Sequence, residues 1–500
     1  MVGGLDKNHC IVLKDGKFDT DNGTDANDLK HIFNTIGHND APVLLHFHGG
    51  LTNKQAGVNG ANQLRPVYDG AGVYPIFFVW ESGWEDVLNN NLPTIFKEPV
   101  FQKILARVTQ FAKGKVDKGN RTGTPKAPGG VAVPKESAVR AELNKPADGR
   151  EPFSHMDPRT IPEGDDLTTD ELKQFKDALQ ADPAFDLAVQ QVTAGLTPAG
   201  PVPRGATVRG STATLMDPDA LNQLTVTQKG ARSVSVAIMI GRCALLLVQI
   251  IKRFAQRRDH GFYPTIVEEL FRAFYIGNAG RFLWDGMKQD IVDSFGVGQD
   301  CGGTLFLTEL EKLWKSGKRR RLTLVGHSAG AIYACRFLQE VQSRDLPPDV
   351  HFNVIFIAPA CDFNLLAKTI QSAGNRIDGL RVFGMGDALE RKDAIASVIY
   401  PSSLLYFVSG VIEKEDDCPL VGMQRYYGAP YNDPSTFVDI DYAKKYSLFR
   451  KDSALVWSMA ATASGFSCDM TSHGGWASTN ATVDSVVHII KNGYDYAAVT

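Results

Sequence analysis

Apolar runs of strand length recur along the chain, separated by polar stretches of helix length. The first two are Val43–Phe47 and Tyr74–Trp80. The same rhythm returns later in the chain as Leu322–Val325, Phe352–Ile357, Leu380–Phe383 and Leu404–Val408. Strands that are apolar throughout and alternate with helices are typical of a parallel sheet covered on both faces. The pattern predicts an α/β fold with a mostly parallel central sheet flanked by helices.

Two segments predict long apolar helices. Ala481–Lys491 carries valine and isoleucine at helical spacing and is the expected last helix. Val234–Ile251 approaches the length of a membrane span, but Arg242 lies near its middle. A charge at the mid-depth of a bilayer costs several kcal/mol. We therefore expect a buried helix here and no stable membrane span.

Residues 113–230 interrupt the alternation of strands and helices. They hold 12 of the 25 prolines, a composition that cannot form a continuous sheet element. Thr168 and Glu171 nevertheless fit a capping box at the start of a helix. We expect residues 1–112 to begin the sheet core and residues 231–500 to complete it. The proline-rich insertion between the early strands and the later ones is either a cap or a flexible segment.

Composition and charge are those of an ordinary globular protein. Hydrophobic residues make up 43% of the 500, and 53 basic against 56 acidic residues leave a formal charge of −3. A net charge this small produces only a weak electrostatic field, which argues against a nucleic-acid partner. The seven cysteines are scattered without a C-x-x-C pair, and the N-terminus has no apolar run of signal-peptide length. These features predict a cytoplasmic protein with reduced thiols.

A Gly-x-Ser-x-Gly motif spans Gly326 to Gly330, between a buried strand and a segment that predicts a helix. A serine hydroxyl projects above a strand end only if the chain reverses sharply, and flanking glycines remove side chains that would clash. The helix that follows points its N-terminus at the site, so the Ala329 amide can face a developing oxyanion. The motif predicts Ser328 as a nucleophile, whereas His327 is expected to be a packing residue.

Two further features accompany this motif. The sequence His48-Gly49-Gly50-Leu51 follows the first strand, and His473 lies near the C-terminus. With the serine motif they make the chain resemble α/β-hydrolases of the serine esterase and lipase type. The resemblance covers roughly residues 40–110 and 231–500 and leaves the insertion unmatched. It implies an α/β-hydrolase fold and a Ser-His-Asp catalytic triad.

The resemblance also implies where the oxyanion is held. A tetrahedral intermediate needs two amide donors, and the loop after an early strand supplies the second one in this family. Gly50 is the expected donor, with Gly49 as the alternate. His46 and His48 share one face of the strand, but no third ligand lies nearby and H-E-x-x-H is absent. We expect neither a metal nor another cofactor.

The base follows from the order of the triad along the chain, which in this fold is Ser, acid, His. Three histidines follow Ser328. His351 enters a strand and His488 lies inside the last apolar helix, so both are expected to be structural. His473 lies in a turn-like segment, where an exposed and mobile base is expected. His473 is therefore the predicted base.

The acid remains open among three aspartates. The resemblance places it most often after the strand at Leu380–Phe383, which points to Asp387. Asp362, in the loop after the preceding strand, is the alternative acid. Asp393 is a third candidate, although the sequence predicts it inside the helix after the turn.

Together these features predict a serine hydrolase that cleaves a small-molecule or lipid carboxylic ester through an acyl-enzyme. An amidase, peptidase or acyltransferase would use the same triad, and a hydrolase-fold binding or scaffold protein is an alternative of another class. The sequence leaves the substrate and the oligomeric state undetermined.

Overall fold

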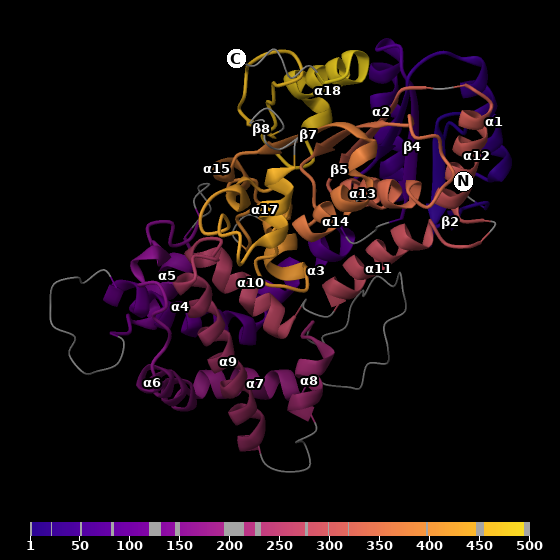
Figure 1. Ribbon diagram of the computed structural model, residues 1–500. Helices are drawn as coiled ribbons and strands as arrows, with labels where there is room; N and C mark the ends of the chain where they lie inside the picture. The colour runs from indigo at the N-terminus through magenta and orange to yellow at the C-terminus, as the bar shows by residue number, and fades with distance from the viewer. Residues whose placement is uncertain are drawn as a thin grey trace. The chain divides into compact units, whose positions relative to one another are not determined.

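The computed structural model describes residues 3–21, 23–50, 53–81, 85–119, 132–145, 151–194, 215–225, 232–275, 279–298, 300–318, 320–396, 399–446 and 455–494. The chain divides into two compact units, and Figure 1 labels many of their elements. The sheet unit comprises Met1–Glu85, Leu283–Asp393 and Pro419–Thr500. The helical unit comprises Asp86–Phe282 and Ala394–Cys418.

The sheet unit is built on an eight-stranded sheet with the order β2-β1-β4-β3-β5-β6-β7-β8. Its strands are β1 (Cys10–Lys14), β2 (Lys17–Phe18), β3 (Val43–Phe47), β4 (Tyr74–Trp80), β5 (Leu322–His327), β6 (Phe352–Ile357), β7 (Ile377–Met385) and β8 (Leu455–Ser458). All neighbouring strands are parallel except β1 and β2. β3, β4 and β6 are buried at every position, as strands covered on both faces must be. The predicted α/β class with a mostly parallel sheet is confirmed.

Helices of the sheet unit pack against these strands and each other. They are α1 (Ala26–His38), α2 (Lys54–Gly70), α12 (Gly302–Lys315), α13 (Gly330–Val341), α14 (Phe363–Ala373), α15 (Asp387–Glu390), α17 (Val438–Lys445) and α18 (Asn480–Asn492). α2 packs on β4, and α13 packs on β5 and β3. Because β5 lies inside the sheet, the turn between β5 and α13 is surrounded by the ends of its parallel neighbours.

The strand expected at Leu404–Val408 is wrong. These residues form α16 (Leu404–Phe407) and the start of a helical turn over Val408–Ile412. The Ser403 side chain accepts a hydrogen bond from the amide of Tyr406 and so caps the helix. Every residue of the segment is buried, and a fully buried short helix has the same apolar run as a buried strand.

The helical unit contains α3 (Glu85–Lys97), α4 (Pro99–Gly119), α5 (Glu136–Leu143), α6 (Thr169–Gln180), α7 (Pro183–Ala194), α8 (Pro218–Thr225), α9 (Arg232–Ala255) and α10 (Phe262–Phe274). α11 (Ala279–Asp293) contains a boundary between the units. α9 packs against α4, α6, α7, α8 and α10. Since α9, α10 and much of α4 lie outside residues 113–230, the expected boundaries at 112 and 230 do not coincide with this unit. The predicted capping box of Thr168 and Glu171 is present at the start of α6.

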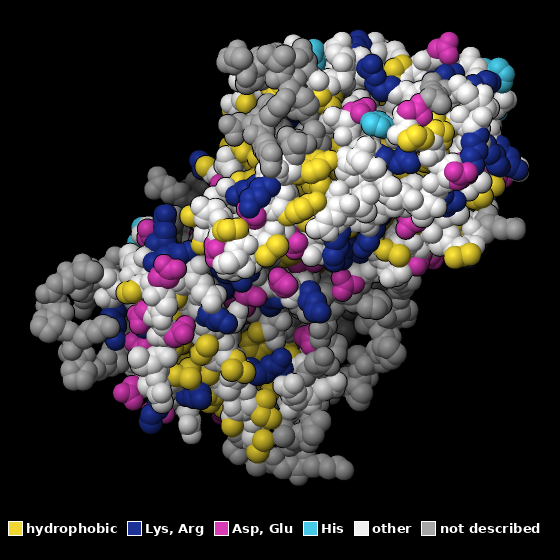
Figure 2. Space-filling view, in the orientation of Figure 1, with side chains coloured by type: hydrophobic (Ala, Val, Ile, Leu, Met, Phe, Trp, Pro, Cys, Tyr) yellow, Lys and Arg dark blue, Asp and Glu magenta, His cyan; other side chains and the backbone are white. Residues whose placement is uncertain are grey.

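α9 contains the segment that the sequence predicts as a buried helix. The helix is there, but only 39% of its most apolar window is buried, and Leu245 is 71% exposed. Figure 2 shows hydrophobic side chains gathered on the face where Figure 1 places α7 and α9. By length and composition α9 is the one helix in the described ranges that could cross a membrane.

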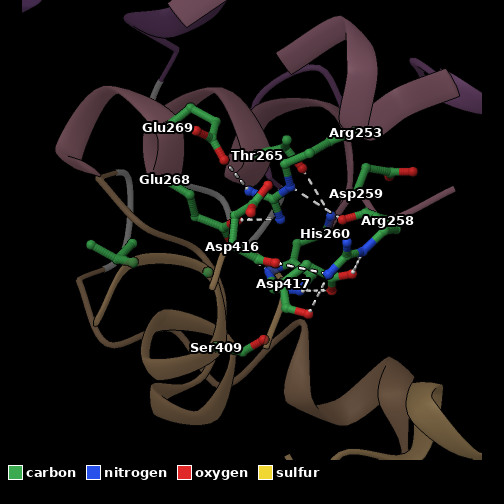
Figure 3. Close-up of polar contacts among 12 residues, drawn as sticks. Arg253, Arg258, Asp259, His260, Thr265, Glu268, Glu269, Ser409, Asp416 and Asp417 are labelled. Atoms are coloured by element: carbon green, nitrogen blue, oxygen red, sulfur yellow. Dashed lines mark hydrogen bonds and ion pairs between the residues drawn. The ribbon is translucent and has the colours of Figure 1, made fainter. Parts of the chain in front are cut away.

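A buried network of charges connects Ala394–Cys418, the second chain segment of the helical unit, to α9, α10 and the loop between them (Figure 3). His260 lies between two carboxylates: Nδ1 is 2.7 Å from Glu268 and Nε2 is 3.0 Å from Asp417. Arg253 forms ion pairs with Glu268 at 2.9 Å and with Glu269 at 2.8 Å. The ring of His260 therefore bridges two buried carboxylates, one on α10 and one at Asp417. The pairing offsets the cost of burying these charges.

Candidate active site

The tightest turn of the site follows β5. Ser328 has a φ of +52°, in the left-handed region that residues other than glycine rarely adopt. Its amide donates to the carbonyl of Ile357, and its carbonyl accepts from the amide of Ala360, so the end of β6 holds the strained residue in place. α13 begins at Gly330, two residues after the serine. The strand, turn and helix that the motif predicts are all present.

The two glycines of the motif stand where no larger residue fits. A Cβ at Gly330 would lie 2.0 Å from the carbonyl oxygen of Phe47. A Cβ at Gly326 would lie 2.8 Å from the backbone nitrogen of Ala331. Both distances are far below van der Waals contact, and the obstructing atoms are backbone. The turn can therefore close only with glycine at both positions.

The fold brings Ser328 and His473 together across 145 residues of sequence. Nε2 of the ring lies 3.0 Å from Oγ of the serine. A base at this distance can take the hydroxyl proton as the oxygen attacks a carbonyl. The two residues are only 4% and 7% exposed, so the expectation of an exposed base is wrong. His473 does lie in a turn, but its ring packs 5.3 Å from the ring of His327.

The surroundings of His473 keep its ring neutral. Burial, as the larger cause, and the interaction with His327, as the smaller one, together lower the pKa of His473 to about 3. The ring is therefore neutral at neutral pH, and the tautomer with its hydrogen on Nδ1 leaves Nε2 able to take a proton, as a general base must. Nδ1 is buried and has no hydrogen-bond partner among the described residues. A buried donor without a partner costs about 1–3 kcal/mol, so an orienting carboxylate would act at this nitrogen.

Neither expected acid lies at this nitrogen. Asp387 begins α15, and its backbone amide donates to the side chain of Gln424 at 3.0 Å. Asp362 caps α14, because its carboxylate accepts from the amide of Leu365 at 2.6 Å. In this structure neither carboxylate forms a hydrogen bond with Nδ1 of His473, and that of Asp362 instead satisfies a helix N-terminus.

Asp393 is the carboxylate that contacts the loop of the base. α15 ends at Glu390, so Asp393 lies in the bend after the helix and not inside it as the sequence predicts. Its Oδ2 accepts from the backbone amide of His473 at 2.7 Å. Burial raises the pKa of Asp393, and this hydrogen bond lowers it in part. Asp393 and Asp387 both lie between Ser328 and His473 in the sequence, so the chain order Ser, acid, His is compatible with either of them.

The glycine loop after β3 packs directly on the serine turn. A Cβ at Gly49 would lie 3.4 Å from Cβ of Ser328, and a Cβ at Gly50 would lie 2.7 Å from Cβ of Ala329. No described residue accepts a hydrogen bond from the amides of Gly49, Gly50 or Ala329. The expected oxyanion loop and the expected donor on the serine turn are therefore neighbours, with their amides unused.

His48 holds this loop in one orientation. Its Nδ1 donates to the carbonyl of Gly49 at 2.7 Å, and its Nε2 accepts from the amide of Trp80 at 3.1 Å. The ring also stacks on the indole of Trp80 at 4.0 Å, and burial lowers the pKa of His48 to about 4. Because the N–H of a trans peptide points opposite to its C=O, a fixed Gly49 carbonyl fixes the direction of the Gly50 amide.

His46 and His48 do not present a pair of open metal ligands. Both ring nitrogens of His48 are in hydrogen bonds. His46 lies 3.4 Å from the hydroxyl of Tyr68 and stacks on the ring of Trp476. Burial lowers the pKa of His46 to about 3. The two histidines pack and orient the strand end, where their neutral rings are buried.

Comparison of the chain with known protein families, with curated proteins and with solved structures finds no match. The chemistry of the site is therefore argued from its own residues: a strained serine, a neutral imidazole within hydrogen-bond distance, two sets of amides without acceptors among the described residues, and a carboxylate that contacts the loop of His473.

Proposed function

We propose that this protein is a serine hydrolase with an α/β-hydrolase fold that cleaves carboxylic esters. The observation that carries the proposal is the pair formed by Ser328 and His473, with Oγ and Nε2 3.0 Å apart at a strained strand-to-helix turn. Strain at a single residue is maintained where the surrounding backbone over-determines it, and such positions cluster at active sites. The parallel strands support it as well, since their carboxyl ends place the contributing loops at one edge of the sheet.

In the acylation step, Oγ of Ser328 attacks the ester carbonyl carbon while its proton moves to Nε2 of His473. The carbonyl oxygen becomes an oxyanion, which the amides of Ala329 and Gly50 stabilise. When the tetrahedral intermediate collapses, the bond to the alcohol breaks and the leaving oxygen takes the proton from Nε2. The acyl group then remains on the serine.

Deacylation repeats these steps with water as the nucleophile. Nε2 of His473 takes a proton from the attacking water, the same amides hold the second oxyanion, and the proton returns to Oγ of Ser328. The carboxylic acid leaves and the enzyme is restored. No cofactor enters the balance of either step.

We assign the role of the acid to Asp393 in place of Asp387. A triad carboxylate fixes the imidazole in the tautomer with Nδ1 protonated and stabilises the charged ring during reaction. Asp393 supports this assignment because it already contacts the backbone of His473. Its carboxylate does not form a hydrogen bond with Nδ1 of the ring in this structure, so the assignment rests on the backbone contact.

Labelling with a fluorophosphonate, followed by a series of p-nitrophenyl esters, tests the proposal. The wild-type protein should be labelled and should hydrolyse esters, and Ser328→Ala should do neither. Ser372→Ala is the matched control, because this serine is exposed on α14 and its hydroxyl donates to the carbonyls of Lys368 and Thr369 in its own helix. Equal labelling of wild type and Ser328→Ala would overturn the assignment of the nucleophile.

The same experiment separates the alternatives. Faster cleavage of matched amide or peptide substrates than of esters would indicate an amidase or a peptidase. Acyl transfer to an added alcohol in preference to water would indicate an acyltransferase. A folded wild-type protein that neither reacts with the fluorophosphonate nor cleaves any of these substrates would favour a binding protein.

A further inference from the structure

His327 is the residue that precedes the proposed nucleophile, and its side chain reaches the loop of the proposed base. Its Nε2 lies 3.0 Å from the backbone carbonyl oxygen of His473. A carbonyl oxygen only accepts, so Nε2 of His327 carries the hydrogen. The sequence predicts a packing residue at this position, and a directed hydrogen bond is more than packing.

The surroundings of His327 keep it in this donor state. Burial lowers its pKa to about 4, so the ring is neutral at physiological pH, with its one hydrogen on Nε2. On the other side of the ring, a Cβ at Gly49 would lie 3.1 Å from Nδ1. The ring also lies 6.0 Å from the ring of Trp476. His327 therefore contacts the glycine loop and the base loop while it belongs to the serine turn.

Both backbone polar groups of His473, the N–H and the C=O, consequently form hydrogen bonds. Its N–H donates to Asp393 at 2.7 Å, and its C=O accepts from His327 at 3.0 Å. The two partners come from different elements, the bend after α15 and the end of β5. A residue held at both groups cannot rotate about its backbone without breaking one of these hydrogen bonds.

We infer that His327 is a positioning residue that sets the distance between Ser328 and His473. The inference rests on the proposed function, and it adds a role that the triad itself does not include. Because His327 is covalently next to Ser328, its hydrogen bond ties the base loop to the same strand end that carries the nucleophile. A misplacement of about 1 Å can reduce a rate by about a hundredfold, so this connection controls the proton transfer.

Two substitutions at position 327 separate the hydrogen bond from the volume of the ring. His327→Leu fills much of the space but has no donor, whereas His327→Gln can place an amide N–H near the position of Nε2. We expect His327→Leu to lower kcat at least tenfold with little change in KM, and His327→Gln to recover most of the loss. A residue that only packs would give the same kcat in both variants.

His9→Leu is the matched control. His9 is also buried in the sheet unit, and its Nδ1 lies 2.7 Å from the backbone carbonyl of Pro75. This substitution removes a buried contact of the same kind at a site without a proposed role in catalysis. It should cost stability in a melting experiment and leave kcat and KM unchanged. If His9→Leu and His327→Leu lower kcat equally, the inference fails.

A second readout does not depend on turnover. In ¹⁵N-histidine spectra, assigned with His473→Gln, His327→Leu should shift the Nε2 resonance of His473, while His9→Leu should leave it in place. If the wild-type protein is inactive but this shift occurs, the proposed function fails and the positioning contact stands. If the wild-type protein is active and neither kcat nor the resonance changes in His327→Leu, the inference fails and the proposed function stands.

Discussion

Oδ2 of Asp393 lies 2.7 Å from the backbone nitrogen of His473 and accepts its hydrogen. The contact joins two loops that follow different strands of the sheet, β7 and β8. It distinguishes Asp393 from Asp387, which lies six positions earlier and starts α15. The acid proposed here therefore rests on a tertiary contact, and substitution of the two aspartates tests it directly.

Asp393→Asn should lower kcat by about 10³–10⁴-fold, because an amide at this position cannot stabilise the charged imidazole or hold its tautomer. Asp387→Asn should stay within a few-fold of wild type. Initial rates on p-nitrophenyl acetate at pH 8 measure both, with circular dichroism to verify folding. A large loss in Asp387→Asn with a nearly normal Asp393→Asn would return the role to Asp387.

Gly330→Ala should destabilise the sheet unit by about 1–3 kcal/mol and abolish fluorophosphonate labelling. The added methyl group would meet the backbone of Phe47 at 2.0 Å, and a packed strand end cannot move without strain. Gly60→Ala in α2 is the control, since a Cβ there meets nothing within 4 Å and alanine favours a helix. Urea unfolding compares the two, and equal stability would contradict the steric requirement.

His48→Phe should lower kcat by about ten- to a hundredfold with KM nearly unchanged. Phenylalanine retains the stacking on Trp80 but cannot donate to the carbonyl of Gly49, so the Gly50 amide loses its fixed direction, and a misdirected oxyanion donor stabilises the transition state less. Tyr68→Phe, which removes only a hydroxyl near His46, should leave kcat unchanged. Steady-state kinetics on one ester measure both variants. Wild-type kcat in His48→Phe would exclude this positioning role.

The sheet unit should lose stability as the pH falls from 7 to 5. The residues responsible are buried imidazoles, whose pKa values burial lowers to about 3 in His46 and His473 and to about 4 in His48 and His327. In the unfolded chain an imidazole titrates near 6.5, so below that pH the unfolded state binds more protons and is favoured.

Each of these imidazoles should lower the free energy of unfolding by roughly 2 kcal/mol at pH 5. This is an upper limit, because local unfolding lets a ring take up a proton before the whole unit unfolds. Hydrogen–deuterium exchange of peptides from β3 and β5 at the two pH values measures the loss. His46→Phe should reduce the pH dependence, because it removes one titrating group. Equal protection of β3 and β5 at pH 7 and pH 5 would contradict this prediction.

His260→Leu should destabilise the helical unit by about 3–5 kcal/mol, because it leaves Glu268 and Asp417 buried without the ring between them. His351→Leu is the control: its Nδ1 lies 2.7 Å from Asp378, but both side chains of this pair are exposed, and such pairs contribute about 0–1 kcal/mol. Exchange protection of residues 399–418 reports the loss in His260→Leu, and that of β6, which His351 precedes, reports the loss in the control. Similar small losses in both variants would show that the buried network is not stabilising.

Local features were predicted correctly wherever neighbouring residues decide them. β3, β4 and β6 have the bounds of the apolar runs that predict them, because a strand buried on both faces must be apolar throughout. The prediction of a strand at 404–408 is wrong, because a buried helix of one turn and a buried strand have the same run of apolar residues. β2 and β8 are short and carry little periodic signal.

The sequence by itself determined the class of the fold and the serine turn, because backbone sterics and hydrophobic alternation act between residues that are close along the chain. It also limited the base to three histidines and the acid to a few aspartates. Only the tertiary structure placed Asp393 against the backbone of His473, joined His327 to the same residue and extended the helical unit beyond the proline-rich segment. Each of these depends on contacts between residues far apart in sequence, whose geometry is set by how the elements pack and not by any local pattern.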